Sequence, residues 1–237
     1  MQAMRHFSLR LARVLVLSAC ALGTAGAHAS GFPQIKVPPG AETQWVAEDM
    51  VHNGVPMRIR RFTTRDNVQS VLDYYFTRWA PPGTSREVIT SLGPWSVLAR
   101  PQGRYVLSVQ VRAADRGAEG FLAVSDLGKA KPYRKPGAGF PLLRGTQVLG
   151  DSQSRDHGRK ARTLMLRNDF SMDANHAFYE QQLGAAGWTK TGQGTRSQDA
   201  WVTLFQRQSV ELTLVVESAQ GGTIVVANLV GEDCCSW

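Results

Sequence analysis

Hydrophobic and polar residues follow the same order in the first and second halves of the chain. In each half, one alternating segment comes first, helical spacing follows, and three further alternating segments come last. The alternation is clearest at residues 104–112 and 210–217, where it has the period of an antiparallel strand with one buried face. Two helices are predicted, over residues 68–79 and 172–186, because apolar residues recur there at helical intervals.

Residues of the same type recur at matching positions in the two halves. Gly40 aligns with Gly145 and Trp95 with Trp201, and predicted helices lie between them. Self-similarity at a nearly constant spacing indicates a duplicated structural unit. We therefore predict an α+β fold of two tandem β-α-β-β-β repeats, each an antiparallel sheet with one helix packed on one face.

The predicted repeats are separated by a segment of different composition. Residues 128–140 (GKAKPYRKPGAGF) are rich in Gly, Pro and basic residues, which indicates a linker and not a helix or strand. The predicted organisation is a signal peptide (1–29), a first repeat (30–127), this linker (128–140), a second repeat (141–231) and a tail (232–237).

The first 29 residues have the composition of an export signal. Three arginines precede the apolar run 14–26, and Ala27-His28-Ala29 fits a signal-peptidase site that leaves Ser30 as the first residue. The run is too short to span a bilayer as a helix. The sequence thus predicts a periplasmic or secreted protein of bacterial type, with no transmembrane helix in the mature chain.

A second interpretation of the same segment remains open. Leu17-Ser18-Ala19-Cys20 has the form of a lipobox, in which Cys20 becomes lipidated and is the first residue of the mature chain. The chain would then be an outer-membrane lipoprotein anchored through Cys20. The apolar run continues beyond Cys20, which favours the signal-peptidase interpretation.

The charge of the chain is mildly basic once this segment is removed. Residues 1–29 contain three of the 27 Lys and Arg and none of the 19 Asp and Glu, so their loss lowers the formal net charge from +8 to +5. A positive charge of this size is compatible with weak attraction to anionic surfaces. Nucleic acid is not an expected partner, because no strand combines basic and aromatic residues in the required pattern.

Cysteine chemistry is limited to the tail of the predicted mature chain. Cys234 and Cys235 are adjacent, and export would permit a disulfide. A bond between neighbouring residues closes a strained ring, so an intermolecular bond or two unpaired tail residues remain as alternatives.

The second predicted helix carries the one constellation with potential chemistry. Asp173, His176 and Glu180 share a helical face, as a metal site or an acid/base group requires. In the first half, however, the position of His176 is held by the core residue Leu72. We therefore favour a structural role for these three residues, expect neither metal nor cofactor, and keep catalysis as the alternative.

Basic residues form three stretches that are the predicted contacts for an anionic ligand or partner. They are Arg58, Arg60, Arg61, Lys129, Lys131, Arg134, Lys135, Arg159, Lys160 and Arg162. Solvated charges on ordinary surfaces are the alternative explanation.

The function predicted from these features is binding and not catalysis. The chain contains no GxSxG elbow, P-loop or HExxH motif. We expect an exported cell-envelope binding or scaffold protein with an envelope protein as partner, accessory to a secretion, pilus or surface-assembly system. The alternative is an envelope enzyme or small-ligand binder that uses a cleft between the repeats.

Overall fold

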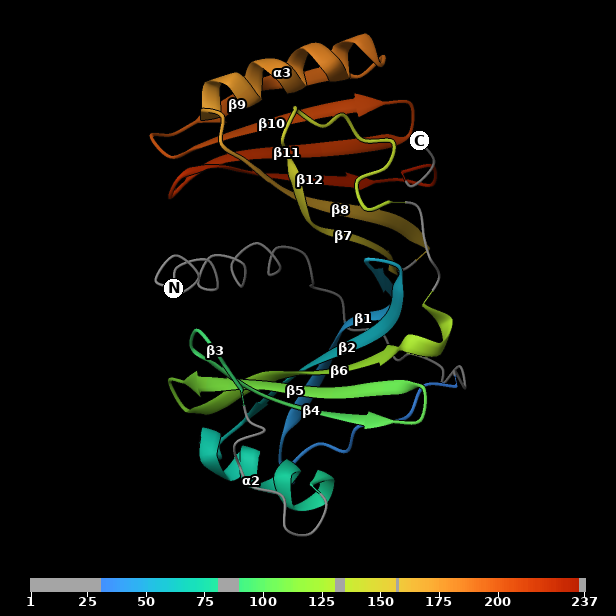
Figure 1. Cartoon of the computed structure of the whole chain (residues 1–237), viewed down its shortest axis with the longest axis vertical. Coiled ribbons are helices and arrows are strands. Elements are labelled where there is room, and N and C mark those ends of the chain that lie inside the picture. Colours follow the sequence, from blue (N-terminus) through green and yellow to red (C-terminus); the bar gives the residue numbers. More distant parts are fainter. Residues whose placement is uncertain (1–30, 81–89, 131–134, 157, 235–237) are drawn as a thin grey trace. The chain divides into compact units, whose positions relative to one another are not determined.

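The computed structural model describes residues 31–80, 90–130, 135–156 and 158–234 (Figure 1). The chain divides into two compact units. The first unit comprises residues up to Val46 together with Arg58–Gly128, and the second comprises Ala47–Met57 together with Lys129–Trp237. Among the described residues, no helix is long and apolar enough to cross a membrane.

The described part of the first half has two strands, a helix, four strands and a short 3-10 turn. They are β1 (Glu42–His52), β2 (Val55–Thr64), α2 (Val68–Trp79), β3 (Thr90–Leu92), β4 (Trp95–Gln102), β5 (Tyr105–Ala114), β6 (Gly117–Asp126) and η2 (Leu127–Lys129). The second half has the same order of strands and helix. Its elements are β7 (Gln147–Asp156), β8 (Arg159–Asn168), α3 (Met172–Ala185), β9 (Thr189–Arg196), β10 (Ala200–Arg207), β11 (Val210–Ala219) and β12 (Gly222–Val230).

The predicted fold of two tandem β-α-β-β-β repeats, each with its own sheet, is wrong. The strands form one 12-stranded antiparallel sheet in the order β3-β4-β5-β6-β2-β1-β7-β8-β12-β11-β10-β9, and two short α-helices accompany it within the described residues. Four strands were missed: β1, β3, β7 and β9. β1 is exposed along most of its length, so its sequence has no buried face to create an alternation. β9 contains Gly192 and Gly194, which favour a loop prediction.

Helix α2 covers one face of the strands in the first unit (Figure 1). It begins after Asn67, whose side chain accepts a hydrogen bond from the backbone N–H of Ser70 and so satisfies an otherwise unpaired helix-end donor. Its buried residues Val71, Leu72 and Tyr75 pack against the apolar side chains of β4, β5 and β6. Burial of this face, more than helix propensity, stabilises so short a helix.

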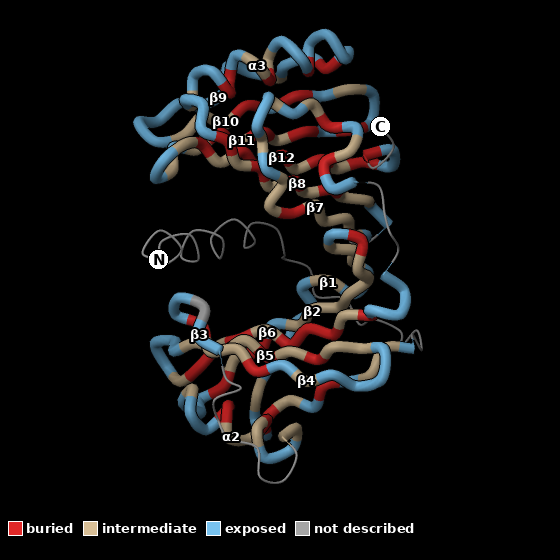
Figure 2. The backbone as a smooth tube through the Cα atoms, viewed as in Figure 1, coloured by how far each residue is buried: buried red, intermediate tan, exposed pale blue. Residues whose placement is uncertain are grey.

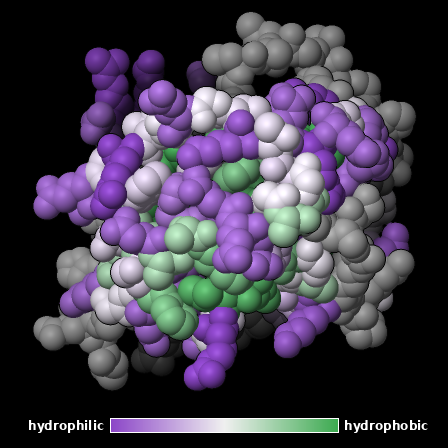
Figure 3. Space-filling model, turned by 90° about the horizontal axis from the view of Figure 1, so that it is seen from above, coloured by the Kyte–Doolittle hydropathy of each residue, from purple (hydrophilic) through white to green (hydrophobic). Residues whose placement is uncertain are grey.

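Helix α3 is placed in the same way over strands of the second unit (Figure 2). Ser171 caps it by accepting a hydrogen bond from the N–H of Ala174. Tyr179 and Leu183 pack on alternate residues of β8, β10, β11 and β12. Seen from above, the side that carries α3 is largely hydrophilic, with hydrophobic side chains gathered in one part of it (Figure 3).

Each helix contributes one tyrosine to its core, but the two hydroxyl groups differ. The hydroxyl of Tyr75 donates to the backbone oxygen of Lys36 at 2.9 Å. The hydroxyl of Tyr179 is buried and has no hydrogen-bond partner among the described residues. Burial raises the pKa of both phenols, so both are neutral at physiological pH.

This difference predicts opposite effects of the same substitution. Tyr75→Phe is expected to lower the free energy of unfolding by about 1 kcal/mol, because the backbone oxygen of Lys36 loses its donor. Tyr179→Phe should leave it unchanged or raise it, because a buried unpaired hydroxyl is removed. Urea unfolding of the two variants measures the difference, and equal losses would contradict the assignment.

Candidate functional site

His176 lies on the buried face of α3, within the predicted constellation. Its ring packs against Trp201 of β10 with the ring centroids 3.5 Å apart. Its Nε2 lies 3.2 Å from Oγ1 of Thr203, and its Nδ1 lies 3.6 Å from Oε2 of Glu180. The histidine therefore has a partner at each nitrogen and an aromatic contact on its ring.

The two carboxylates of the constellation are held by basic residues of β9. Glu180 binds Lys190, and Asp173 lies 3.1 Å from Arg196. Glu180 therefore lies beside His176, as the constellation requires, whereas Asp173 is paired with Arg196. Within the described ranges, no group of three His, Cys, Asp or Glu residues is arranged to hold a metal ion. His176 is thus packed against Trp201, and the charged side chains of Glu180 and Lys190 lie next to it.

Burial lowers the pKa of His176 below its ordinary value of 6.5, against the opposing effect of Glu180. Burial likewise lowers the pKa of His52, where Asp151 acts in the opposite direction. A histidine with a lower pKa in the folded state takes up its proton more readily when unfolded. Its contribution to stability is therefore present above the unfolded pKa and is lost as the pH falls through 6.5 toward the folded pKa.

The expected result is a loss of stability on mild acidification. Between about pH 7.5 and about pH 5.5, each histidine should contribute at most about 1.4 kcal/mol per pH unit to the fall in the free energy of unfolding. His176→Leu, which introduces the residue found at the aligned position of the first half, should remove the part due to His176. Urea unfolding at several pH values measures this slope; an unchanged slope in His176→Leu would assign the pH dependence to other groups.

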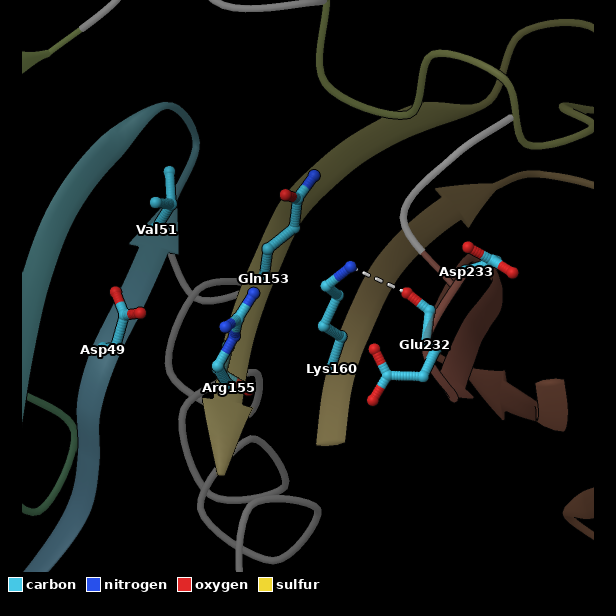
Figure 4. Close-up of a pocket in the computed structure, with 8 residues that line it drawn as sticks. Asp49, Val51, Gln153, Arg155, Lys160, Glu232 and Asp233 are labelled. Carbon is cyan, nitrogen blue, oxygen red and sulfur yellow. Dashed lines mark hydrogen bonds between the residues drawn. The ribbon is translucent and has the colours of Figure 1, made fainter. Parts of the chain in front are cut away.

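A shallow recess of about 420 Å³ lies in the second unit, lined by β1, β7, β8 and residues after β12 (Figure 4). Lys160 points across it, and its Nζ donates to the backbone oxygen of Glu232 at 2.9 Å. Asp49, Arg155 and Asp233 add side chains of both charges. Small-molecule sites are mostly apolar with a few placed polar groups, so this recess does not have the character of a ligand pocket.

The predicted basic contacts fall into separate environments. Arg58 and Arg60 on β2 lie beside Trp45 of β1. Arg61 faces the other way along β2 and binds Glu119 at 2.6 Å. Burial alone would raise the pKa of Glu119, but hydrogen bonds from Arg61 and Arg112 outweigh it, and the pKa is lowered. Arg61 is therefore already engaged in an ion pair.

The remaining predicted contacts lie in the second unit or outside the described residues. Arg159 is exposed and 3.9 Å from Glu211, and Lys160 lines the recess. Arg162 is buried and forms an ion pair with Asp151 at 2.7 Å, so it is closed to a partner. Lys129 ends η2, and Lys135 is exposed in the following loop. Lys131 and Arg134 lie outside the described residues.

Of the three cysteines named in the predictions, the structure describes one, Cys234. Cys234 is buried in the core of the second unit, with 1% of its surface exposed. Cys20 and Cys235 lie outside the described residues, as does the predicted targeting segment. The lipidation and disulfide alternatives thus stay predictions.

An apolar row that was not predicted from the sequence lies on the face of strands β8, β12, β11 and β10 opposite α3. Val202, Val215, Val226 and Met165 are direct cross-strand neighbours on β10, β11, β12 and β8. Side chains alternate between the two faces of a strand. These four therefore point away from the α3 side, where Leu164, Leu212, Leu214 and Val225 form the core. We call this surface the open face.

The open face combines apolar side chains with a polar border. Leu204 lies two residues from Val202 and is 46% exposed. Thr213, Asn228 and Thr163 form the neighbouring cross-strand row. The run Ile224-Val225-Val226-Ala227 was a usable signal, because consecutive apolar residues are typical of a strand with two apolar faces. α3 packs only against the opposite face, and the described part of this unit provides no second helix.

Comparison with known proteins gives no help in assigning the open face. No family model, curated protein or solved structure matches the chain.

Proposed function

We propose that the protein is an exported cell-envelope binding or scaffold protein that docks an envelope protein on the open face of its second unit. The observation that carries the proposal is the apolar cross-strand row Val202–Val215–Val226–Met165 on the face opposite α3. A sheet with apolar residues on both faces is normally covered on both faces. Val226 of this row is buried and the other three residues are half-buried, whereas Leu204 beside them is 46% exposed. Exposed apolar side chains with polar borders are typical of protein-interaction sites.

The arrangement favours binding over catalysis. The residues that could have formed an acid/base or metal site are ion-paired or packed: Asp173 with Arg196, Glu180 with Lys190, and His176 against Trp201. Apolar contact over a sheet needs no reactive group, and its affinity comes from the area removed from water. The proposed partner thus offers an apolar surface of its own.

Site-specific photocrosslinking tests the docking surface. A photoreactive residue at Leu204 is expected to give adducts with one or a few envelope proteins in cells. The matched position is Gln181, an exposed residue of α3 on the other side of the sheet. Adducts from 204 but not from 181 would support the proposal; adducts from neither position, or equally from both, would contradict it.

A substitution separates binding from folding in the same assay. Leu204→Lys should abolish the crosslinks made from a neighbouring position, because a charge is placed in the apolar contact. Leu204 is 46% exposed, so this change should lower the free energy of unfolding by about 1 kcal/mol or less. An unchanged crosslinking pattern in Leu204→Lys would exclude the open face as the docking site.

Export is tested independently of the partner. The proposal expects the cell-envelope form to begin at Ser30. Lipidation, the alternative, would start the chain at Cys20 and would be abolished by Cys20→Ser. N-terminal sequencing and labelling with a fatty-acid analogue distinguish the two, and an intact Met1 on the mature protein would exclude both.

A further inference from the structure

Two arginines and two aromatic rings alternate on the surface of the first unit. The guanidinium carbon of Arg58 lies 5.3 Å from the ring centre of Phe32 and 5.7 Å from that of Trp45. The guanidinium carbon of Arg60 lies 5.2 Å from the ring centre of Trp45. We call these four residues the arginine–aromatic ladder. All of them belong to the first unit, whereas the open face belongs to the second.

The ladder holds its cations in place without neutralising them. Arg60 donates to the backbone oxygen of Ile35 at 2.7 Å, which fixes that guanidinium beside Trp45. Among the described ion pairs, none involves Arg58 or Arg60. A guanidinium that stacks on a ring keeps the N–H groups of its edge free for hydrogen bonds in its own plane. The ladder therefore presents two guanidinium groups that have no acidic partner among the described ion pairs.

The indole of Trp45 is exposed, whereas Phe32, Arg58 and Arg60 are half-buried. Trp45 has 41% of its surface exposed, which is unusual for so large an apolar side chain. Indole rings are amphipathic and favour the boundary between polar headgroups and hydrocarbon. Arginine favours the phosphate layer directly above that boundary, because its fork matches phosphate oxygens. The two chemistries are adjacent here, as they are in an anionic phospholipid surface.

We propose that the arginine–aromatic ladder binds anionic phospholipid headgroups, with Arg58 and Arg60 on the phosphates and Trp45 inserted at the interface. A soluble anionic polymer would satisfy the two arginines but offers no apolar layer for the indole. This surface goes beyond the protein-docking function proposed for the open face and would bring the protein to a membrane surface. Its attraction should weaken with added salt, because the contacts with phosphate are largely electrostatic.

Vesicle cosedimentation tests the proposal with the chain that begins at Ser30, since the apolar run 14–26 would itself bind lipid. The chain is expected to bind vesicles that contain phosphatidylglycerol and not vesicles of phosphatidylcholine alone. Arg58→Gln with Arg60→Gln should lower the partition coefficient by about tenfold or more, since each basic residue near an anionic surface adds several-fold. Trp45→Ala should lower it several-fold at unchanged net charge.

The matched control removes the same charge elsewhere. Arg155→Gln with Arg159→Gln lies in the second unit, where both side chains are exposed. It should reduce binding by about twofold or less, because only the long-range attraction changes. If both double variants lost vesicle binding equally, net charge alone would explain the loss, and the proposal would be overturned. Arg58→Lys with Arg60→Lys keeps the charges but removes the planar forks, so its binding should lie between that of the wild type and that of the glutamine variant. Circular dichroism of every variant checks that the fold is intact.

Two further outcomes would also overturn the proposal. The first is failure of the wild-type chain to bind phosphatidylglycerol vesicles at low salt. The second is complete displacement by dextran sulfate together with wild-type binding by Trp45→Ala, which would assign the ladder to a soluble anionic polymer. Crosslinking from Leu204 depends on neither result, so the open face and the ladder can fail separately.

Discussion

Replacing Arg162 with methionine is expected to lower the free energy of unfolding by about 3–5 kcal/mol. Nε and one terminal nitrogen of Arg162 bind the two carboxylate oxygens of Asp151 at 3.0 and 2.7 Å. The side chains are only 3% and 11% exposed. Removing the arginine leaves a buried carboxylate without its counter-charge, and that loss exceeds the net value of the pair itself.

The same two residues also hold a loop that comes from the predicted linker. The guanidinium of Arg162 donates to the backbone oxygen of Ala138 at 3.1 Å, and the carboxylate of Asp151 accepts from the N–H of Gly137 at 2.9 Å. Phe140 next to this loop is buried in the core of the second unit. The substitution should therefore expose this loop to proteolysis as well as lower global stability.

An exposed ion pair in the same unit provides the control. Arg196 lies 3.1 Å from Asp173, with side chains 56% and 66% exposed. Arg196→Met should cost about 1 kcal/mol or less, because solvent screens the pair. Combining Arg162→Met with Asp151→Leu should recover part of the loss, since no buried charge is then left alone. Urea unfolding measures all three, and similar losses in Arg162→Met and Arg196→Met would show that the Asp151 pair is not desolvated.

Gly222→Ala is the second substitution with a large expected effect, about 3 kcal/mol or more. Gly222 begins β12 with φ of +145°, which side-chain-bearing residues rarely adopt. A Cβ at this position would lie 2.3 Å from the backbone oxygen of Asn168 and 3.1 Å from Cα of Asp169. Because the clash is with backbone, a rotamer change cannot relieve it, and the end of the β8–β12 pairing must move apart.

Gly192→Ala separates the clash from the cost of the backbone conformation. Gly192 also has a positive φ, +78°, but a Cβ there would meet no atom within 4 Å. Its substitution should cost about 1 kcal/mol, the penalty for a left-handed conformation alone. Denaturant unfolding of both variants measures the difference, and equal effects would show that β8 and β12 do not approach this closely.

The same close approach occurs in the first unit, which gives the prediction a second test. Gly117 begins β6 with φ of +109°, and a Cβ there would lie 2.2 Å from the backbone oxygen of Thr64 at the end of β2. Gly117→Ala should therefore behave like Gly222→Ala. Gly117 and Gly222 each begin the last strand of their half, so the two halves share this local structure. The prediction that was wrong is that each half forms a β-α-β-β-β unit with its own sheet.

The sequence predicted those elements whose burial is regular and local. The helix expected over 68–79 coincides with α2, and the strand expected over 210–217 lies within β11. In both, a single face meets one core, so the period of the apolar residues follows the geometry of the element. β1 was missed because neither of its faces is well buried along most of its length.

The candidate sites depended on contacts that the sequence does not contain. Arg162 and Arg60 look alike in the sequence as members of basic stretches, yet one is a buried ion-pair partner and the other lies beside an exposed indole. Val215 stood between the buried residues Leu214 and Val216, and nothing local showed that it faces Val202 and Val226 across the strands. These assignments follow from strand register.

By itself, the sequence determined the positions of both helices and of most of the described strands, since local periodicity specifies which face of an element is apolar. Only the tertiary structure decided how the strands join into one sheet, which arginines are buried, and which apolar residues share the open face. Pairing between strands far apart in the chain sets these, because hydrogen bonds between backbones are the same whatever the side chains, and register is chosen by the packing of the whole sheet.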